Sequence, residues 1–416
     1  MRKIREKKLE EQLAVFIFMQ PFIYYTNYVL DIIGVTGYAS RIGYPLITIY
    51  AFIVFIKAFA AEYRKVIFIT CILFALLASS IYLHDNTILI NMISPRVFVL
   101  SDLNVFVSIV LPVIWIALLG VDYKRFLHVS RHISILLICM QLFIFIATTA
   151  LNKKSISNDY MSYSYSALLP FFICYYYRNK NVLQRVTAYI ALGLQLIAGC
   201  RGAMLTAITF CFLFHFIKGN ASVSIKTVVK WIATIIVIYI FISQFDSLVT
   251  LLYEFLKKIG FSSRTLSKIQ SSSDQFWSSQ RTELYSEASK YLSIIGVGIY
   301  GDRPILGTYA HNWIMEILLH FGIAIGALFV LCVICQTIYT IMLARKSNTD
   351  LIIVYELAAS ISYLFVKYML SSSYLISSEF FLSILFLLDA KRRLLSSSNE
   401  KRNSSIMQSQ YIKVDA

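Results

Sequence analysis

The sequence predicts an all-α, polytopic integral membrane protein of about 12 transmembrane helices with one long external loop. Of its 416 residues, 58% are hydrophobic and 14% are charged, and the mean hydropathy is +0.70. A soluble domain carries about 25% charged and about 45–50% apolar residues, so this excess is too large for a buried core. The apolar runs are continuous rather than alternating, which favours helices over a barrel, the other architecture that spans lipid.

Spanning helices need about 20 apolar residues each, within a range of about 17–25. The apolar runs predict helices at 13–30, 43–60, 66–83, 105–119, 133–151, 163–177, 186–200, 202–217, 229–245, 314–343, 351–370 and 374–389. About nine of these helices fall in residues 1–245 and about three in 314–395, on either side of a long loop at 246–313. The Ser-, Asn- and Gln-rich tail at 396–416 is predicted to be a disordered cytoplasmic segment.

The distribution of basic residues predicts the orientation of the chain. The net charge is +16, and the clusters of Lys and Arg in the short connections fall on one side of the membrane if every predicted helix spans. That side includes both termini, so the positive-inside rule places them in the cytoplasm and the long loop outside. The same rule accounts for the basic charge without nucleic acid as a partner. Long loops translocate regardless of charge, so the arginines of the external loop need another explanation.

Neither a metal nor a cofactor is expected. All seven cysteines lie in or at the ends of apolar runs, which does not favour a redox or zinc role. The six histidines include no set of three with a spacing that would bind a metal. No cytoplasmic segment is long enough to form a nucleotide-binding domain.

Arg201 lies within an apolar stretch, 186–217, that is too long for one spanning helix. At about 1.5 Å per residue the stretch would measure roughly 48 Å, against a hydrocarbon core of about 30 Å. Gly199 and Gly202 flank the arginine, and we expect the helix to break there. An arginine at membrane depth is costly and typical of a functional site, although snorkelling to lipid headgroups is the alternative.

The external loop carries three further arginines. Arg281 follows two serines that can cap a helix, so it is predicted to lie in a first helical turn. An arginine there opposes the helix dipole, and a bound anion would relieve that conflict. A solvated ion pair with Glu283 is the alternative. Arg264 and Arg303 are weaker candidates for the same anion, because a loop arginine is usually only solvated.

A polar box follows where the loop re-enters the membrane. His311 is the candidate base, because histidine is the usual side chain for moving a proton near neutral pH. Asn312 can cap the next helix, in which Glu316 and His320 share a face and Gly322 predicts a break. A structural role for His311 and an intramembrane salt bridge for Glu316 and His320 are the alternatives.

Three elements together resemble those of the O-antigen ligase and O-antigen polymerase superfamily. The Gly-Cys-Arg-Gly-Ala element at 199–203 resembles its Ser-Arg-Gly-Ala element. Residues 280–298 resemble its Arg…Gly-x-Gly loop, and residues 311–326 its His-Asn…Glu…Gly-Ile…Gly box. Two departures are that Cys200 stands where the family has serine and that the Arg-x10-Gly spacing of some polymerases is absent at Arg281.

The resemblance implies a metal-independent membrane glycosyltransferase on the outer face of the bacterial inner membrane. It would move an oligosaccharide from undecaprenyl pyrophosphate to an acceptor hydroxyl. Arg201 and Arg281 would stabilise the pyrophosphate leaving group, and His311 would take the proton from the hydroxyl. The residues expected to bind pyrophosphate or sugar are Arg201, Arg281, Arg264, Arg303, Asn312 and Glu316.

Three functions remain open at this point. A polymerase that joins lipid-linked repeat units into O-antigen or capsule chains is favoured, with a chain-length regulator as a candidate partner. A ligase that transfers the glycan to lipid A-core is the first alternative. A transporter or flippase of lipid-linked oligosaccharide also suits twelve helices. Such proteins usually carry internal repeats, however, and neither the break at Arg201 nor the long loop has a counterpart in the first half of the chain.

Overall fold

The computed structural model describes residues 2–35, 37–83, 99–150, 156–198, 200–218, 250–251, 254, 258, 280–346 and 349–414. All regular structure within these ranges is helical. The predicted helix at 229–245 and the candidate residue Arg264 lie outside them.

The described chain forms helices of very different lengths. Their bounds are α1 (Arg2–Ile32), α2 (Tyr38–Leu83), α4 (Val99–Val105), α5 (Leu111–Leu118), α6 (Tyr123–Ala150), α7 (Ile156–Tyr165), α8 (Leu168–Tyr177), α9 (Val182–Ala198), α10 (Arg201–Lys218), α14 (Gln280–Lys290), α15 (Asp302–Leu306), α16 (Trp313–Lys346), α17 (Leu351–Ser362), α18 (Tyr368–Leu370) and α19 (Ser378–Val414). Single π-helical segments, Phe106–Val110 and Tyr363–Lys367, join α4 to α5 and α17 to α18.

Five of the described helices are long and apolar enough to cross a membrane. They are Leu9–Ile32, Tyr38–Leu76, Tyr123–Thr148, Trp313–Arg345 and Leu351–Leu370. Shorter apolar helices cover Asp102–Leu118, Val182–Ala198 and Gly202–Ile217. This is the architecture of a helical membrane protein, and every predicted helix that falls within the described ranges has a helical counterpart. The total of twelve spans stays a prediction.

Three elements differ from the sequence prediction. The predicted helix 163–177 is divided between the end of α7 and α8 by a turn at residues 166–167. The predicted helices 43–60 and 66–83 form one element, α2, which is interrupted at Glu62 (φ −143°, ψ 50°). The tail at 396–416, predicted to be disordered, continues α19 as helix to Val414. Neither glycine nor proline occurs from Ser378 to Val414. A helix that is already nucleated extends at low cost through such a segment, whatever its polarity.

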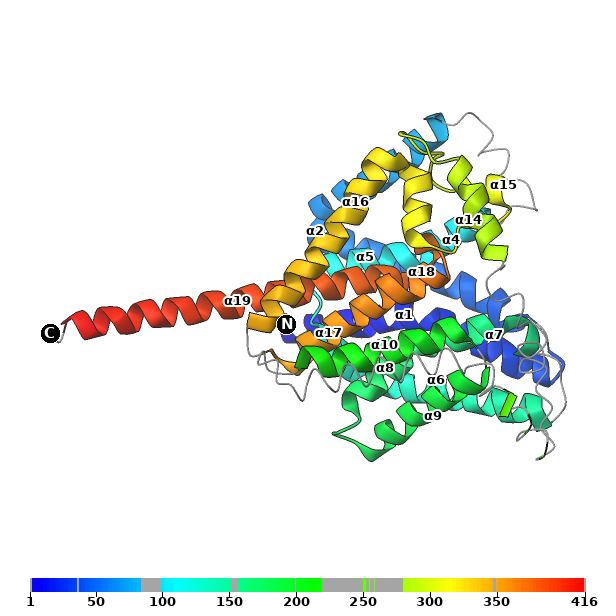
Figure 1. Ribbon diagram of the computed structural model, residues 1–416, viewed down its shortest axis with the longest axis horizontal. Coiled ribbons are helices and arrows are strands. Elements are labelled where there is room, and N and C mark those ends of the chain that lie inside the picture. Colours follow the sequence, from blue (N-terminus) through cyan, green and yellow to red (C-terminus); the bar gives the residue numbers. More distant parts are fainter. Residues whose placement is uncertain are drawn as a thin grey trace.

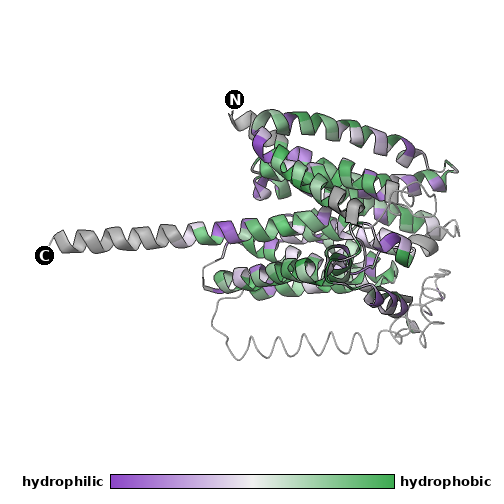
Figure 2. Ribbon diagram, turned by 90° about the horizontal axis from the view of Figure 1, so that it is seen from above, coloured by the Kyte–Doolittle hydropathy of each residue, from purple (hydrophilic) through white to green (hydrophobic). Residues whose placement is uncertain are grey.

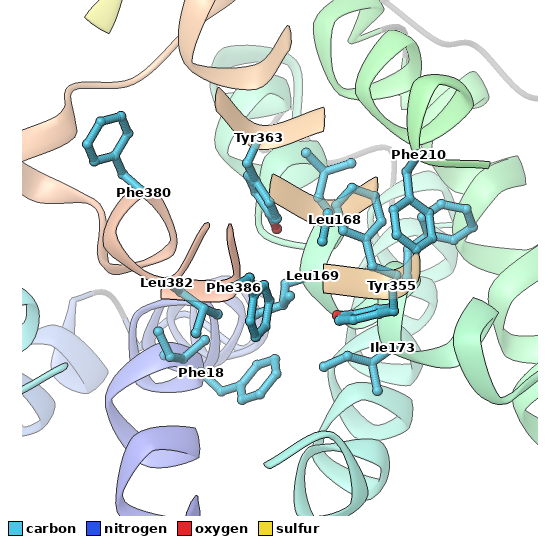
Figure 3. Close-up of a cluster of buried hydrophobic side chains, with 14 of the residues drawn as sticks. Phe18, Leu168, Leu169, Ile173, Phe210, Tyr355, Tyr363, Phe380, Leu382 and Phe386 are labelled. Carbon is cyan, nitrogen blue, oxygen red and sulfur yellow. The ribbon is translucent and has the colours of Figure 1, made fainter. Parts of the chain in front are cut away.

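The helices pack into a bundle around an aromatic core. Helices α1, α6, α8, α10, α17 and α19 lie side by side in Figure 1, and α19 extends far beyond them. Figure 3 shows buried side chains from several of these helices meeting at the centre, among them Phe210, Tyr355, Tyr363 and Phe386. Figure 2 shows hydrophobic residues along most of the helix lengths and hydrophilic residues mostly near the helix ends.

A polar region lies at one end of the bundle. In Figure 1, α14 and α15 lie at the end of the bundle opposite to the one from which α19 emerges. These helices pack against each other and against α16. The segment from α14 to the start of α16 carries most of the candidate site.

Candidate functional site

Helix α16 is interrupted at Gly322, as the glycine predicts. Gly322 has φ 75° and ψ 169°, a conformation that essentially only glycine adopts. Figure 1 shows the two parts of α16 running in different directions from this point. Backbone groups beside such a break lose their partners within the helix and need others.

The Gly-x-Gly loop, residues 293–298, supplies those partners. Three backbone hydrogen bonds join it to the break, from Val297 N to Leu319 O (2.6 Å), from Gly298 N to His320 O (3.1 Å) and from Ile323 N to Ser293 O (2.8 Å). The loop therefore takes the place of the missing helical turn.

Glycine is required on both sides of this junction. A Cβ atom on Gly296 would collide with the backbone nitrogen of Gly322, and one on Gly322 would collide with the carbonyl of Ile294. Both glycines also have positive φ. The Gly-x-Gly loop and the helix that carries Glu316 and His320 are thus a single packed unit.

Arg303, in the short helix α15, is enclosed by carboxylates from three elements. Its side chain is 4% exposed and forms ion pairs with Asp302 (2.5 Å), Glu316 (2.9 Å) and Asp102 of α4 (3.2 Å). It also donates to the hydroxyl of Ser373 at 3.1 Å. These contacts use all five N–H groups of the guanidinium. Arg303, predicted to bind pyrophosphate, has no donor left for a phosphate, and Glu316 is likewise engaged within the protein.

Both members of the central ion pair on α15 are held in their charged forms. Burial acts to raise the pKa of Asp302, but Arg303 and His320 outweigh it and hold that pKa below its ordinary value. Burial acts to lower the pKa of Arg303, and Asp302 and Glu316 outweigh it and raise that pKa. The contribution of Asp302 to stability is therefore fully present above the unfolded pKa of about 3.9 and is lost as the pH falls towards the folded value.

His320 completes this buried network. Its Nε2 lies 2.8 Å from Oδ1 of Asp302, and its Nδ1 lies 2.8 Å from the hydroxyl of Tyr374. The salt bridge considered between Glu316 and His320 is replaced by two separate pairs, Glu316 with Arg303 and His320 with Asp302.

The segment 371–377, between α18 and α19, also contacts the network through Glu316. Ser373 donates to Glu316, and the backbone nitrogen of Tyr374 donates to the same carboxylate at 3.3 Å. Ser372 has φ 73°, which is uncommon for a residue other than glycine and is held only where the surrounding structure determines it.

Four members of the network were missed by sequence reasoning. They are Asp102, Asp302, Ser373 and Tyr374. The adjacent opposite charges of Asp302 and Arg303 are the one local signal that could have indicated an ion pair. The other contacts join residues 201 and 70 positions apart in the chain.

The same network contains three groups with the spacing of metal ligands. One donor atom from each of Asp302, Glu316 and His320 lies within 4.8 Å of the others. Arg303 donates hydrogen bonds to both carboxylates, so its guanidinium supplies the positive charge that a cation would supply. The donor set therefore fits the arginine that occupies it.

Asn312 caps the N-terminus of α16, which confirms the predicted cap. Its Oδ1 accepts hydrogen bonds from the backbone nitrogens of Ile314 (3.0 Å) and Met315 (3.2 Å). We expect Asn312→Ala to destabilise the protein by about 1 kcal/mol, because two amide groups lose their acceptor. The measurement is the thermal midpoint in detergent. Asn312→Asp keeps the acceptor and is the control, so an equal loss in both variants would contradict the capping role.

His311, the candidate base, adjoins the cap in a strained conformation. It has φ 54°, and its side chain is partly exposed. Its ring lies 4.2 Å from the ring of Tyr309, centroid to centroid. The guanidinium of Arg303 lies 5.3 Å from the centre of the same tyrosine ring. Tyr309 thus lies between the candidate base and Arg303 of the buried network.

The predicted helix break at Arg201 is confirmed. Helix α9 ends at Ala198, and α10 begins at Arg201. A Cβ atom on Gly202 would collide with the hydroxyl of Tyr165 and lie 3.7 Å from Cβ of Leu370. The start of α10 therefore packs beside the end of α18, directly before the segment 371–377 that reaches Glu316.

Arg281 lies in the first turn of α14, as predicted. Ala288, further along α14, is buried against Ala310 and Leu319, which brings this helix to the re-entry point of the loop. The side chains of Arg201 and Arg281 lie outside what the structure describes. That they meet His311 in one pocket stays a prediction.

An apolar cavity of about 420 Å³ borders the network. Side chains of α2, α16, α19 and the segment 103–111 line it. Tyr374, a member of the network that bonds to His320, also lines the cavity. A further lining residue, Tyr300, has its ring 5.5 Å from the guanidinium of Arg303. The lining is apolar enough to suit a hydrocarbon chain.

Comparison with known proteins identifies no relative of this chain. A scan against protein-family models, a search of curated proteins and a search of solved structures each found no match.

Proposed function

We propose that this protein is a membrane glycosyltransferase that joins undecaprenyl-pyrophosphate-linked oligosaccharide repeat units into a surface polysaccharide, O-antigen or capsule. The proposal includes twelve spans in the bacterial inner membrane, both termini in the cytoplasm and the active site on the external face. It needs neither a nucleotide nor a metal cofactor, because the donor arrives already activated by its pyrophosphate.

One observation carries the proposal furthest. The Gly-x-Gly loop hydrogen-bonds to the broken helix that follows His311 and Asn312. This packing joins two of the three elements that resemble the superfamily, which are separate in the sequence, and so supports their action in one site. The third element, at Arg201, is connected to that site through Leu370 and the segment 371–377.

The chemistry proceeds as one displacement at the anomeric carbon of the donor sugar. The acceptor hydroxyl attacks this carbon and its proton passes to His311. The bond from carbon to the pyrophosphate oxygen breaks, and undecaprenyl pyrophosphate leaves with the electron pair. Arg201 and Arg281 stabilise the charge that develops on this leaving group.

The contacts of Arg303 favour a pyrophosphate position away from it. Its donors are all engaged by the carboxylates of Asp102, Asp302 and Glu316 and by Ser373, so none is left for an anion. Arg303 and Glu316 therefore act by fixing α15 and α16, and the arginines of α10 and α14 bind the phosphates. The apolar cavity beside α16 would take the polyprenyl chain.

We expect Arg201→Ala, Arg281→Ala and His311→Ala each to leave the protein in the membrane at normal abundance and to abolish long polysaccharide chains. The loss of one leaving-group contact or of the base costs about 10²-fold or more in rate. The measurement is the chain-length ladder of the surface polysaccharide, with abundance determined by immunoblot. Lys290→Ala is the control, because it removes an exposed cation from α14, the helix of Arg281. Normal ladders in all three variants would disprove the catalytic assignment.

The same experiment separates the proposed polymerase from its alternatives. Loss of a polymerase leaves single repeat units on the acceptor. Loss of a ligase leaves long chains on undecaprenyl pyrophosphate, and loss of a transporter leaves lipid-linked repeats on the cytoplasmic side. Extraction of the lipid-linked fraction from each variant strain distinguishes the three.

A further inference from the structure

A second ionisable cluster lies at the opposite end of the bundle from the candidate site. Glu356, in the second turn of α17, is completely buried, with 0% of its surface exposed. Neither of its carboxylate oxygens receives a hydrogen bond from a donor within the described residues, and none of the ion pairs found there includes it. A buried carboxylate without a partner is costly, so this side chain needs an explanation.

The group that faces Glu356 is another carboxyl, that of Asp389 on α19. The two carboxyls lie within hydrogen-bond reach of each other. Asp389 is itself 5% exposed, and arginines engage both of its oxygens, Arg392 at Oδ1 and Arg393 at Oδ2 (2.6 Å). Asp389 therefore has the partners of an ionised carboxylate, whereas Glu356 has none.

Arg392 and Arg393 are near enough to act electrostatically on Glu356, but neither forms an ion pair with it among the described residues. Tyr123 of α6 and Tyr176 of α8 lie close enough to interact electrostatically with Glu356, as does the adjacent Tyr355. Figure 3 shows the ring of Tyr355 in the aromatic core, close to Phe386 of α19. The ion pairs of both arginines go to other carboxylates, since Arg392 binds Asp389 and Arg393 bridges Asp389 and the half-buried Asp122. Asp350 at the start of α17 adds one more negative charge near Tyr176.

Two carboxyls in contact cannot both be ionised without a cation between them. We propose that Glu356 and Asp389 form a proton-binding site, in which Glu356 carries the proton and donates it to Asp389. One hydrogen bond then satisfies the buried carboxyl, and the charge of Asp389 stays balanced by its two arginines. The proposal does not rest on the glycosyltransferase function, because none of its residues belongs to the candidate site.

A hydrophobic carbodiimide tests the protonation state directly. A protonated carboxyl in an apolar environment adds across a C=N bond of dicyclohexylcarbodiimide and rearranges to a stable N-acylurea, which peptide mass spectrometry locates. We expect the full-length protein in lipid vesicles to be labelled at Glu356 at pH 7. Above the pH at which the site loses its proton, labelling should fall about tenfold per pH unit.

The chain provides an internal control in Glu379 of α19. This side chain is buried, as Glu356 is, but it forms an ion pair with Lys367 (3.7 Å). Glu379 should remain unlabelled. Three outcomes would each overturn the proposal. They are equal labelling of Glu379 and Glu356, labelling of Asp389 in place of Glu356, and no labelling of Glu356 between about pH 6 and about pH 8. Protection of Glu356 by sodium at constant pH would also overturn it, in favour of a sodium site.

Stability provides a second readout that does not depend on reactivity. The amide of Glu356→Gln donates the same hydrogen bond to Asp389 but cannot lose a proton. The proposed proton stays on Glu356 in the folded protein at pH 7, whereas a glutamate in the unfolded chain ionises above a pKa of about 4.3, so the stabilising effect of the proton is lost as the pH rises. The thermal midpoint of the wild type should therefore fall between neutral and alkaline pH relative to that of Glu356→Gln. Parallel curves for the two proteins would contradict the shared proton.

Discussion

Replacing Gly322 with alanine is expected to abolish the accumulation of folded protein. Alanine at φ 75° and ψ 169° would occupy a region that costs about 1–3 kcal/mol. Its Cβ atom would also collide with the carbonyl of Ile294. The atoms that it meets are backbone, which cannot rotate away, so the three hydrogen bonds between the Gly-x-Gly loop and α16 must break as well. Together these losses approach the whole stability of an ordinary domain, about 5–15 kcal/mol.

Two other glycines separate the causes of this effect. Gly193 is helical, and nothing lies within 4 Å of a Cβ atom built on it, so Gly193→Ala should be neutral or slightly stabilising. Gly120 has φ 85° with the same open space, so Gly120→Ala introduces strain without a collision. We expect abundance and detergent-solubilised monodispersity to decrease in the order Gly193→Ala, Gly120→Ala, Gly322→Ala. If Gly322→Ala resembles Gly120→Ala, the loop does not pack on the break as described.

The elements that could be predicted from the sequence are those with a local cause. Spanning helices follow from the length of each apolar run, and the breaks at Arg201 and Gly322 follow from glycine inside such runs. The cap at Asn312 follows from one side chain and the amides next to it. In each case the physical cause lies within a few residues of its effect.

The buried network could not be predicted in the same way. Asp102 and Arg303 are 201 residues apart, and Ser373 is 70 residues from the same arginine. Nothing in the sequence around Asp102 distinguishes it from a solvated loop residue. Only the packing of α4, α15 and α16 brings these charges together, so a loop arginine expected to bind an anion is instead enclosed by carboxylates.

Arg303→Ala tests whether that arginine serves structure or substrate. The substitution would leave Asp302 and Glu316, each with 0% of its side chain exposed, without their cation. Removing one partner of a buried ion pair costs about 3–5 kcal/mol, so we expect little folded protein in the membrane. This outcome differs from that of His311→Ala, which should remove long chains while the protein stays abundant. A phosphate ligand at position 303 would give the second pattern.

A variant in which both carboxylates are neutral distinguishes a structural role of Arg303 from a substrate-binding role. In Asp302→Asn/Glu316→Gln the two carboxylates are neutral, so adding Arg303→Ala to this pair no longer leaves them as unpaired buried charges. We expect the abundance lost in Arg303→Ala to recover partly in the triple variant, with a coupling energy of about 0.5–3 kcal/mol between the sites. Recovered protein that also makes long chains would show that Arg303 contacts no substrate. If the triple variant is as poorly folded as Arg303→Ala, the cost lies in lost packing, because a long arginine side chain also fills space between α4, α15 and α16.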